Sequence, residues 1–219
     1  MQRSVVLVVL LLAACQPAGG GTPQAASSPA ATTARANLYQ CEGCEGALEA
    51  DPATLTNAAR IGPGIDMGEP LVIDGIVYQN NGKAPAAGVI IYAYQTNADG
   101  LYGNGSPKTE SSRRHGRLRG WVKTGADGRY HFDTIKPAPY PNDTIPAHIH
   151  LTVLEPGKRP YWIDDIVFDG EFGVTDAYRR SVTNQGGNGI VRAIRRPNQH
   201  WHVQRDIVLE RHPSEESIQ

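Results

Sequence analysis

The sequence predicts an all-β fold, a β-sandwich of about seven to eight strands with long loops and a short irregular or helical N-terminal segment. Its 24 Gly and 16 Pro among 219 residues suit short strands and turns better than helices. Short apolar or alternating runs also recur between clusters of Gly, Asp and Pro. No long amphipathic helix is needed to close the core of such a sandwich. The chain length suits one well-sized core.

The predicted strands begin at Leu71 and follow one another to the end of the chain. The run 129–135 is typical, because Tyr130 and Phe132 alternate with polar neighbours after the turn 125–128. The expected strands are 71–78, 88–94, 118–124, 129–135, 148–154, 162–168 and 206–210, with 190–194 less regular.

The N-terminus reads as a targeting segment that is excluded from the fold. A basic start precedes the apolar run 5–12, which is too short to span a bilayer stably. Leu12-Ala-Ala-Cys15 resembles the lipobox of bacterial lipoproteins. This resemblance implies cleavage before Cys15, lipidation of that residue and export to a membrane, with the outer membrane or cell surface favoured by Gln16. The alternative is an ordinary secretory signal.

Four segments follow from these boundaries. Residues 16–36 are small or polar, which indicates a flexible tether, and two short helical turns are expected at 47–50 and 54–60. The predicted organisation is a lipoprotein signal peptide (1–14), a tether (15–37), an N-terminal arm (38–70) and a sandwich domain (71–212).

Cys41 and Cys44 form a C-x-x-C pair in the N-terminal arm. An exported protein folds in an oxidising compartment, so we expect a small local disulfide between them. A redox site or half of a zinc site are the alternatives, although no second Cys or His pair lies nearby in the sequence.

The overall charge excludes one class of partner. The formal net charge is −1, and no basic stripe appears, so the sequence offers no electrostatic case for binding nucleic acid.

A tyrosine followed by two histidines forms the strongest candidate site. His148 and His150 are two residues apart in a predicted strand, so their side chains share one face while Ile149 takes the other. Two imidazoles with the phenol of Tyr140 upstream suit a metal ion, and a phenolate favours iron(III). A half-buried strand whose polar face carries two histidines is the alternative.

Longer motifs around these residues point to a family. The segments 125–141 and 146–150 closely resemble the intradiol ring-cleavage dioxygenases, most of all the protocatechuate 3,4-dioxygenase branch. The stretch 89–102 fits the run that leads to the family's first ligand tyrosine, and the likeness covers about residues 71–170. It implies a β-sandwich built around one mononuclear non-haem iron(III), without an organic cofactor.

The resemblance also implies a role for each site residue. Tyr102, Tyr140, His148 and His150 would be the metal ligands, and Tyr140 would be the catalytic tyrosine that leaves the metal when substrate binds. The implied reaction is cleavage of a catechol between its two hydroxyls with O2, which gives a muconate-type diacid. The family forms homo- and hetero-assemblies, so a homo-oligomer is one expected state.

Three positions depart from the family pattern. Ile145 stands where the family usually has an Arg that stabilises the charged substrate, Asp165 stands where it has a Gln, and Asn142 replaces a Trp. Which catechol is used therefore stays open. Arg113, Arg114, Arg159 or Arg179 could supply the missing cation.

Other tyrosines and histidines receive structural roles. Tyr92, Tyr94 and Tyr130 are expected to pack in the core or between the sheets, and His115, His131, His200 and His202 have no matching family context.

Two further functions remain open from the sequence. One is a transthyretin-like or carboxypeptidase-regulatory-like binding module, which would explain the turn motifs but not the tyrosine and two histidines. The other is an iron-binding family member whose activity is lost or changed, as Ile145 permits.

Overall fold

The computed structural model describes residues 34–213 except 65–66, 104–108, 110 and 198. The predicted signal peptide, Cys15 and most of the tether therefore lie outside the described residues. Within them, no helix is both long enough and apolar enough to cross a bilayer.

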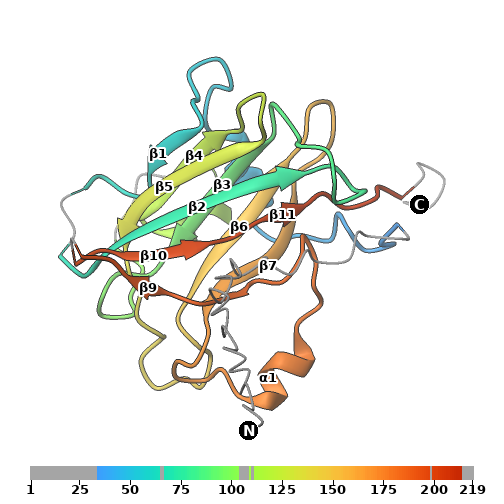
Figure 1. Ribbon diagram of the computed structural model, residues 1–219. Helices are drawn as coiled ribbons and strands as arrows, with labels where there is room; N and C mark the ends of the chain where they lie inside the picture. The colour runs from blue at the N-terminus through green and yellow to red at the C-terminus, as the bar shows by residue number, and fades with distance from the viewer. Residues whose placement is uncertain (1–33, 65–66, 104–108, 110, 198, 214–219) are drawn as a thin grey trace, which may run out of the picture.

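Two β-sheets stacked face to face form the protein, which confirms the predicted all-β sandwich (Figure 1). The first sheet has the order β1–β5–β2–β10–β9, with β11 also paired to β2. Its strands are β1 (Ala58–Arg60), β2 (Pro70–Tyr78), β5 (Arg129–Ile135), β9 (Ile194–Arg195), β10 (Trp201–Gln204) and β11 (Ile207–Val208).

The second sheet carries the candidate site and has the order β4–β3–β6–β7–β8. Its strands are β3 (Ile90–Gln95), β4 (Arg119–Lys123), β6 (His148–Leu154), β7 (Tyr161–Phe168) and β8 (Ile190–Val191). Among the described residues, three short helices lie outside the sheets, η1 (Cys44–Leu48), η2 (Ser111–His115) and α1 (Asp176–Ser181).

The core fills the space between the sheets and sets the direction of the site residues. On β6, Ile149, Leu151 and Val153 are almost completely buried in this core. Because side chains alternate along a strand, His148 and His150 must point to the outer face of the second sheet.

Most predicted strands are confirmed, and the differences lie in short elements. The strand expected at 206–210 is only Ile207–Val208, preceded by β10, and residues 190–194 contribute to two short strands rather than one. The helical turn expected at 54–60 is wrong, because residues 55–57 are not helical and Ala58–Arg60 is a strand that pairs in parallel with β5. The turn expected at 47–50 begins earlier, at Cys44.

A buried arginine ties the C-terminal strands to the second sheet. Arg205 is 1% exposed, and its guanidinium donates to the carbonyl oxygens of Gly186, Gly187, Asp164 and Asp206 at 2.6–3.3 Å. Burial lowers its pKa, but the ordinary value is high enough that the group stays charged. The side chain therefore donates to four backbone carbonyls, one of which, that of Gly186, also accepts from the Val208 N–H at 3.2 Å.

We predict that Arg205→Met lowers the free energy of unfolding by at least about 3 kcal/mol, because each buried carbonyl that loses its donor costs about 1–3 kcal/mol. Urea unfolding followed by fluorescence measures the change. The matched control is Arg195→Met, since Arg195 pairs with the half-exposed Glu69 and should contribute less than about 1 kcal/mol. Equal losses in the two variants would contradict the role given to Arg205.

Candidate metal centre

Two loops bring the tyrosines to the end of β6. The Thr96 hydroxyl donates to the Ala138 carbonyl at 2.8 Å, and the Ala138 N–H donates to the Asn97 carbonyl at 3.1 Å. Gly100 has φ +75°, and a Cβ there would lie 2.0 Å from the Pro139 carbonyl oxygen. Only glycine allows this approach, which holds the loop of Tyr102 against the loop of Tyr140.

Four donor atoms of the predicted ligands meet in a closed ring. The Tyr102 and Tyr140 hydroxyl oxygens are 2.7 Å apart, and the Tyr140 oxygen is 3.2 Å from His148 Nε2. His148 Nε2 is 3.0 Å from His150 Nε2, which is 3.0 Å from the Tyr102 oxygen. The structure thus brings together all four residues selected from the sequence. The centre of such a ring lies about 2 Å from each atom, which is an ordinary metal–ligand distance.

The opposite nitrogen of each imidazole is already engaged. His148 Nδ1 lies 2.7 Å from the Pro146 carbonyl oxygen, and His150 Nδ1 lies 3.2 Å from Asp165 Oδ1. Both partners accept hydrogen bonds, so each Nδ1 donates and each Nε2 presents a lone pair to the ring.

Counting protons shows that the ring suits a cation. Burial lowers the pKa of His148, and burial raises the pKa of Tyr102 and of Tyr140, so without a cation the imidazole is neutral and the phenols keep their protons. Two phenolic protons can serve at most two of the four contacts. The other contacts bring lone pairs together without a proton, and a metal ion would replace that repulsion with coordination while displacing the phenolic protons.

Asp165 lies beside the ring and could be taken for a further ligand. His148, His150 and Asp165 do offer ligand atoms within 4.8 Å of one another, which would suit a two-histidine, one-carboxylate centre. However, Asp165 faces Nδ1 of His150 whereas the ring contains Nε2, and the two nitrogens of one imidazole point in divergent directions. Asp165 therefore orients His150 in the manner of a carboxylate–histidine–metal arrangement.

A stack of aromatic rings supports His150 from the side. The Tyr94 ring lies 4.4 Å from the His150 ring on one face and 3.7 Å from the His115 ring, nearly parallel, on the other. Nδ1 of His115 is 2.8 Å from the Tyr92 hydroxyl. Tyr92, Tyr94 and the buried His115 thus form a support on the outer face of the sheet.

The structure corrects the sequence interpretation of these residues. Ile91 and Ala93 face the core, so Tyr92 and Tyr94 lie on the opposite face and do not pack between the sheets. Tyr130 does lie in the core, as predicted. Pairing β3 with β6 would have revealed the role of Tyr94, which is directly opposite His150 in the register. Nothing in the local sequence identifies His115, because it reaches the site through the distant helix η2.

Residues of the N-terminal arm cover part of this face. A disulfide joins Cys41 and Cys44. Gly43 between them has φ +87°, and a Cβ there would lie 2.5 Å from Nε2 of His115. The arm therefore packs directly on the His115–Tyr94 stack.

The other histidines considered in the sequence analysis lie elsewhere. His131 is on β5, where it pairs with Asp74, and His202 is on β10, so both belong to the first sheet. His200 comes just before β10.

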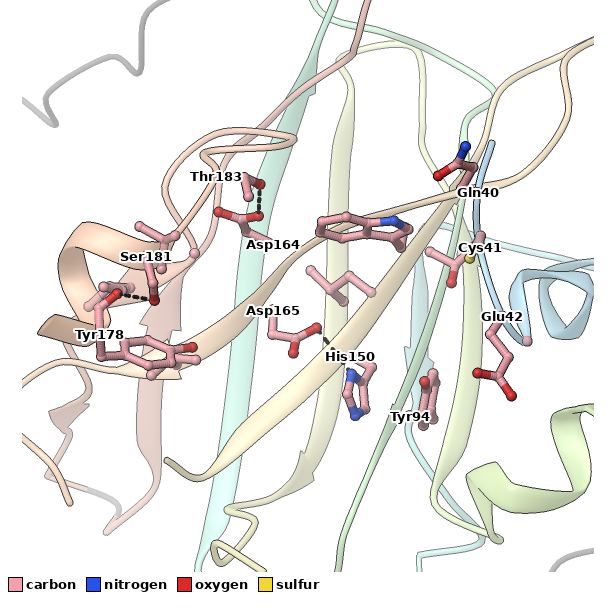
Figure 2. Close-up of a pocket in the computed structure, with 18 residues that line it drawn as sticks. Gln40, Cys41, Glu42, Tyr94, His150, Asp164, Asp165, Tyr178, Ser181 and Thr183 are labelled. Carbon is pink, nitrogen blue, oxygen red and sulfur yellow. Dashed lines mark hydrogen bonds and ion pairs between the residues drawn. The ribbon is translucent and has the colours of Figure 1, made fainter. Parts of the chain in front are cut away.

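A cavity of about 400 Å³ adjoins His150 on the outer face of the second sheet. Figure 2 shows it between the arm residues Gln40–Glu42 and helix α1, with Asp165 facing His150. None of the four arginines considered as replacements for the missing cation lines it. Arg114 pairs with Glu42, Arg159 stacks over Tyr39, and Arg179 pairs with Asp169.

The two sheets and the converging donors define a β-sandwich protein with a candidate mononuclear metal centre. Residues 46–211 match the sequence model of the Dioxygenase family, and the chain belongs to this family.

Individual relatives agree with this assignment. The chain is 34% identical over 134 residues to catechol 1,2-dioxygenase 1 of Acinetobacter lwoffii, which covers 52% of this chain and 42% of that relative. It is 34% identical over 97 residues to the protocatechuate 3,4-dioxygenase beta chain of Burkholderia cepacia, covering 42% of this chain and 41% of that relative. The chain thus spans less than half the length of these curated relatives.

Solved structures share the fold. The dioxygenase domain of a dioxygenase–carbohydrate-binding protein fusion from Streptomyces sp. SirexAA-E superposes with a TM-score of 0.52 at 24% identity. The match covers 69% of this chain and 86% of that domain.

We predict that His115 makes the protein less stable at acid pH. Burial lowers its pKa from 6.5 to about 4, with His150 and Arg119 nearby adding to the effect. The stability that neutral His115 contributes is therefore present above pH 6.5 and is lost as the pH falls through about 4. The loss reaches at most about 3 kcal/mol.

The variant His115→Asn keeps a polar atom near the position of Nδ1 but does not titrate. Urea unfolding between pH 7 and pH 4 measures the free energy of unfolding of both proteins. The difference between the wild type and His115→Asn should decrease as the pH falls. A difference between the two proteins that stays constant over this range would refute the prediction.

Proposed function

We propose that this protein is an intradiol ring-cleavage dioxygenase that cleaves a catechol between its hydroxyls with O2 to give a muconate-type diacid. The observation that carries the proposal is the closed ring of two phenol oxygens and two imidazole nitrogens. Tyr102, Tyr140, His148 and His150 would hold a mononuclear iron(III). That ion supplies Lewis-acid and redox chemistry when bound.

The two tyrosines are suited to different tasks. The loop of Tyr102 is held by the Asn97 side chain, whose Oδ1 accepts from the N–H groups of Asp99 and Leu101, and by the close approach of Gly100 to Pro139. Tyr140 instead begins a turn in which Asn142 has φ +63°. From the family resemblance we propose that Tyr140 is the tyrosine that moves, and that its phenolate oxygen accepts a proton from an arriving diol.

The two histidines hold their positions through partners outside the ring. The Pro146 carbonyl fixes the tautomer of His148, and Asp165 fixes that of His150. Tyr94 and His115 prevent the His150 ring from tilting to one side.

We predict that the purified protein loaded with iron(III) is coloured by tyrosinate-to-iron charge transfer and consumes O2 when catechol is added. Tyr102→Phe should lose the colour and at least about 100-fold in O2 uptake, because it removes one anionic ligand. Visible spectroscopy and an oxygen electrode provide the measurements.

The control is His202→Ala, which changes a histidine of the first sheet and should keep the colour and the uptake. A colourless protein after loading with iron(III), or loss of colour in His202→Ala but not in Tyr102→Phe, would refute the ligand assignment.

An iron-binding member with altered activity is the second candidate. It is favoured by Ile145, which is 44% exposed and carries no charge at the position of the family's arginine. Colour without O2 uptake across a panel of catechols would support this candidate instead.

We also propose that the chain is exported and anchored through a lipidated Cys15. The Leu12–Cys15 sequence supports this proposal. Cys15→Ser should move the protein from the membrane fraction to the soluble fraction of the cells that express it, as immunoblotting would measure. An unchanged distribution would refute the anchor.

A further inference from the structure

The cavity beside His150 is the space into which a bound ring would extend. A volume of about 400 Å³ accommodates a catechol ring with a short substituent. It borders the donor ring at His150, the one ring residue among the described residues that line it, and lies between the arm and helix α1 (Figure 2). This use of the cavity rests on the proposed function.

The charged side chains that line the cavity all have one sign. They are Glu42, Asp164 and Asp165, and no Lys or Arg is among the described residues that line it. The other polar contributions come from uncharged groups such as Tyr178, Ser181 and Thr183.

The three carboxylates differ in how far their charge is compensated. Glu42 is exposed at the rim and pairs with Arg114, so its charge is partly offset. Asp164 is 8% exposed and accepts hydrogen bonds from the Thr183 hydroxyl and the Asn184 N–H, with Arg205 behind it bound to backbone carbonyls. Asp165 accepts from His150.

Asp165 is therefore the carboxylate placed to act on the ligand. It is both a wall of the cavity and the partner of His150, so its charge lies next to the donor ring. A carboxylate on the ligand would meet this charge without any lysine or arginine on the described lining to compensate it. Its desolvation and the repulsion would both oppose binding.

We infer that this cavity receives the ring substituent of the catechol and selects uncharged and cationic substituents over carboxylates. The inference adds the substrate class to the proposed function. Discrimination comes from repulsion of the wrong substrate as much as from attraction of the right one.

Three catechols that share the ring and a two-carbon spacer test this selection. They are 4-ethylcatechol, 4-(2-aminoethyl)catechol and 3-(3,4-dihydroxyphenyl)propanoate. We expect kcat/KM for the propanoate to be at least about tenfold below that of 4-ethylcatechol, and the amine to equal or exceed 4-ethylcatechol. The deficit of the propanoate should shrink in 0.5 M salt, because the added ions shorten the electrostatic screening length to roughly a third of its value in dilute buffer.

Anaerobic titration of the iron(III)-loaded protein gives a second measurement. The dissociation constants come from the shift of the visible band, so they do not depend on turnover. They should follow the same order as kcat/KM.

Two variants locate the selection in the cavity. Asp165→Asn keeps an acceptor for His150 and removes the charge, and it should reduce the discrimination against the propanoate to less than about threefold. Glu42→Gln does not touch His150 and removes one negative charge from the rim, so it should change the discrimination in the same direction. The control is Glu69→Gln, an acid outside the lining, which should leave the discrimination as in the wild type.

The possible outcomes distinguish a failure of the inferred selection from a failure of the proposed dioxygenase function. Equal binding and turnover of 4-ethylcatechol and the propanoate would overturn the inference and leave the dioxygenase proposal standing. Discrimination that is the same in all three variants as in the wild type would also overturn it. Failure of all three catechols to shift the band or consume O2 would overturn the proposed function itself.

Discussion

The candidate site depends on a shortage of protons among four atoms held at hydrogen-bonding distance. The Pro146 carbonyl and Asp165 accept hydrogen bonds from Nδ1 of the two histidines, which leaves the two Nε2 lone pairs facing two phenols. Such an arrangement is costly unless something positive fills it, because two phenolic protons leave two of the four contacts with facing lone pairs and no proton between them. The fold must therefore supply enough rigidity to hold the four groups together before an ion arrives.

That rigidity comes from the second sheet and its cover. Ile149 anchors β6 in the core between the two histidines, so their separation is set by the strand and not by a loop. The Tyr94–His115 stack and the disulfide-bonded arm then close the outer face, which would otherwise be open to solvent. The same arm forms one wall of the cavity, so the element that supports the site also shapes access to it.

Local pattern was sufficient to predict the strands that carry the core and the alternation that pairs His148 with His150. Predicting that Tyr102 and Tyr140 share one site required the family resemblance. The two side chains meet through a contact between Gly100 and Pro139, which no sequence periodicity encodes. Contacts between elements far apart in sequence were missed for the same reason. The strand Ala58–Arg60 pairs with β5, and His115 lies between Tyr94 and the N-terminal arm.

Two departures from the family pattern act in the same electrostatic direction. Ile145 removes a positive charge that the family usually has next to the site, and Asp165 adds a negative charge where the family has an uncharged amide. Together they change the charge near the substrate by two units toward negative. The change leaves the donor ring intact, because Asp165 still offers His150 an acceptor and Ile145 lies outside the ring. Both departures thus bear on the charge of the molecule that we propose this chain accepts, while all four donors of the ring are present.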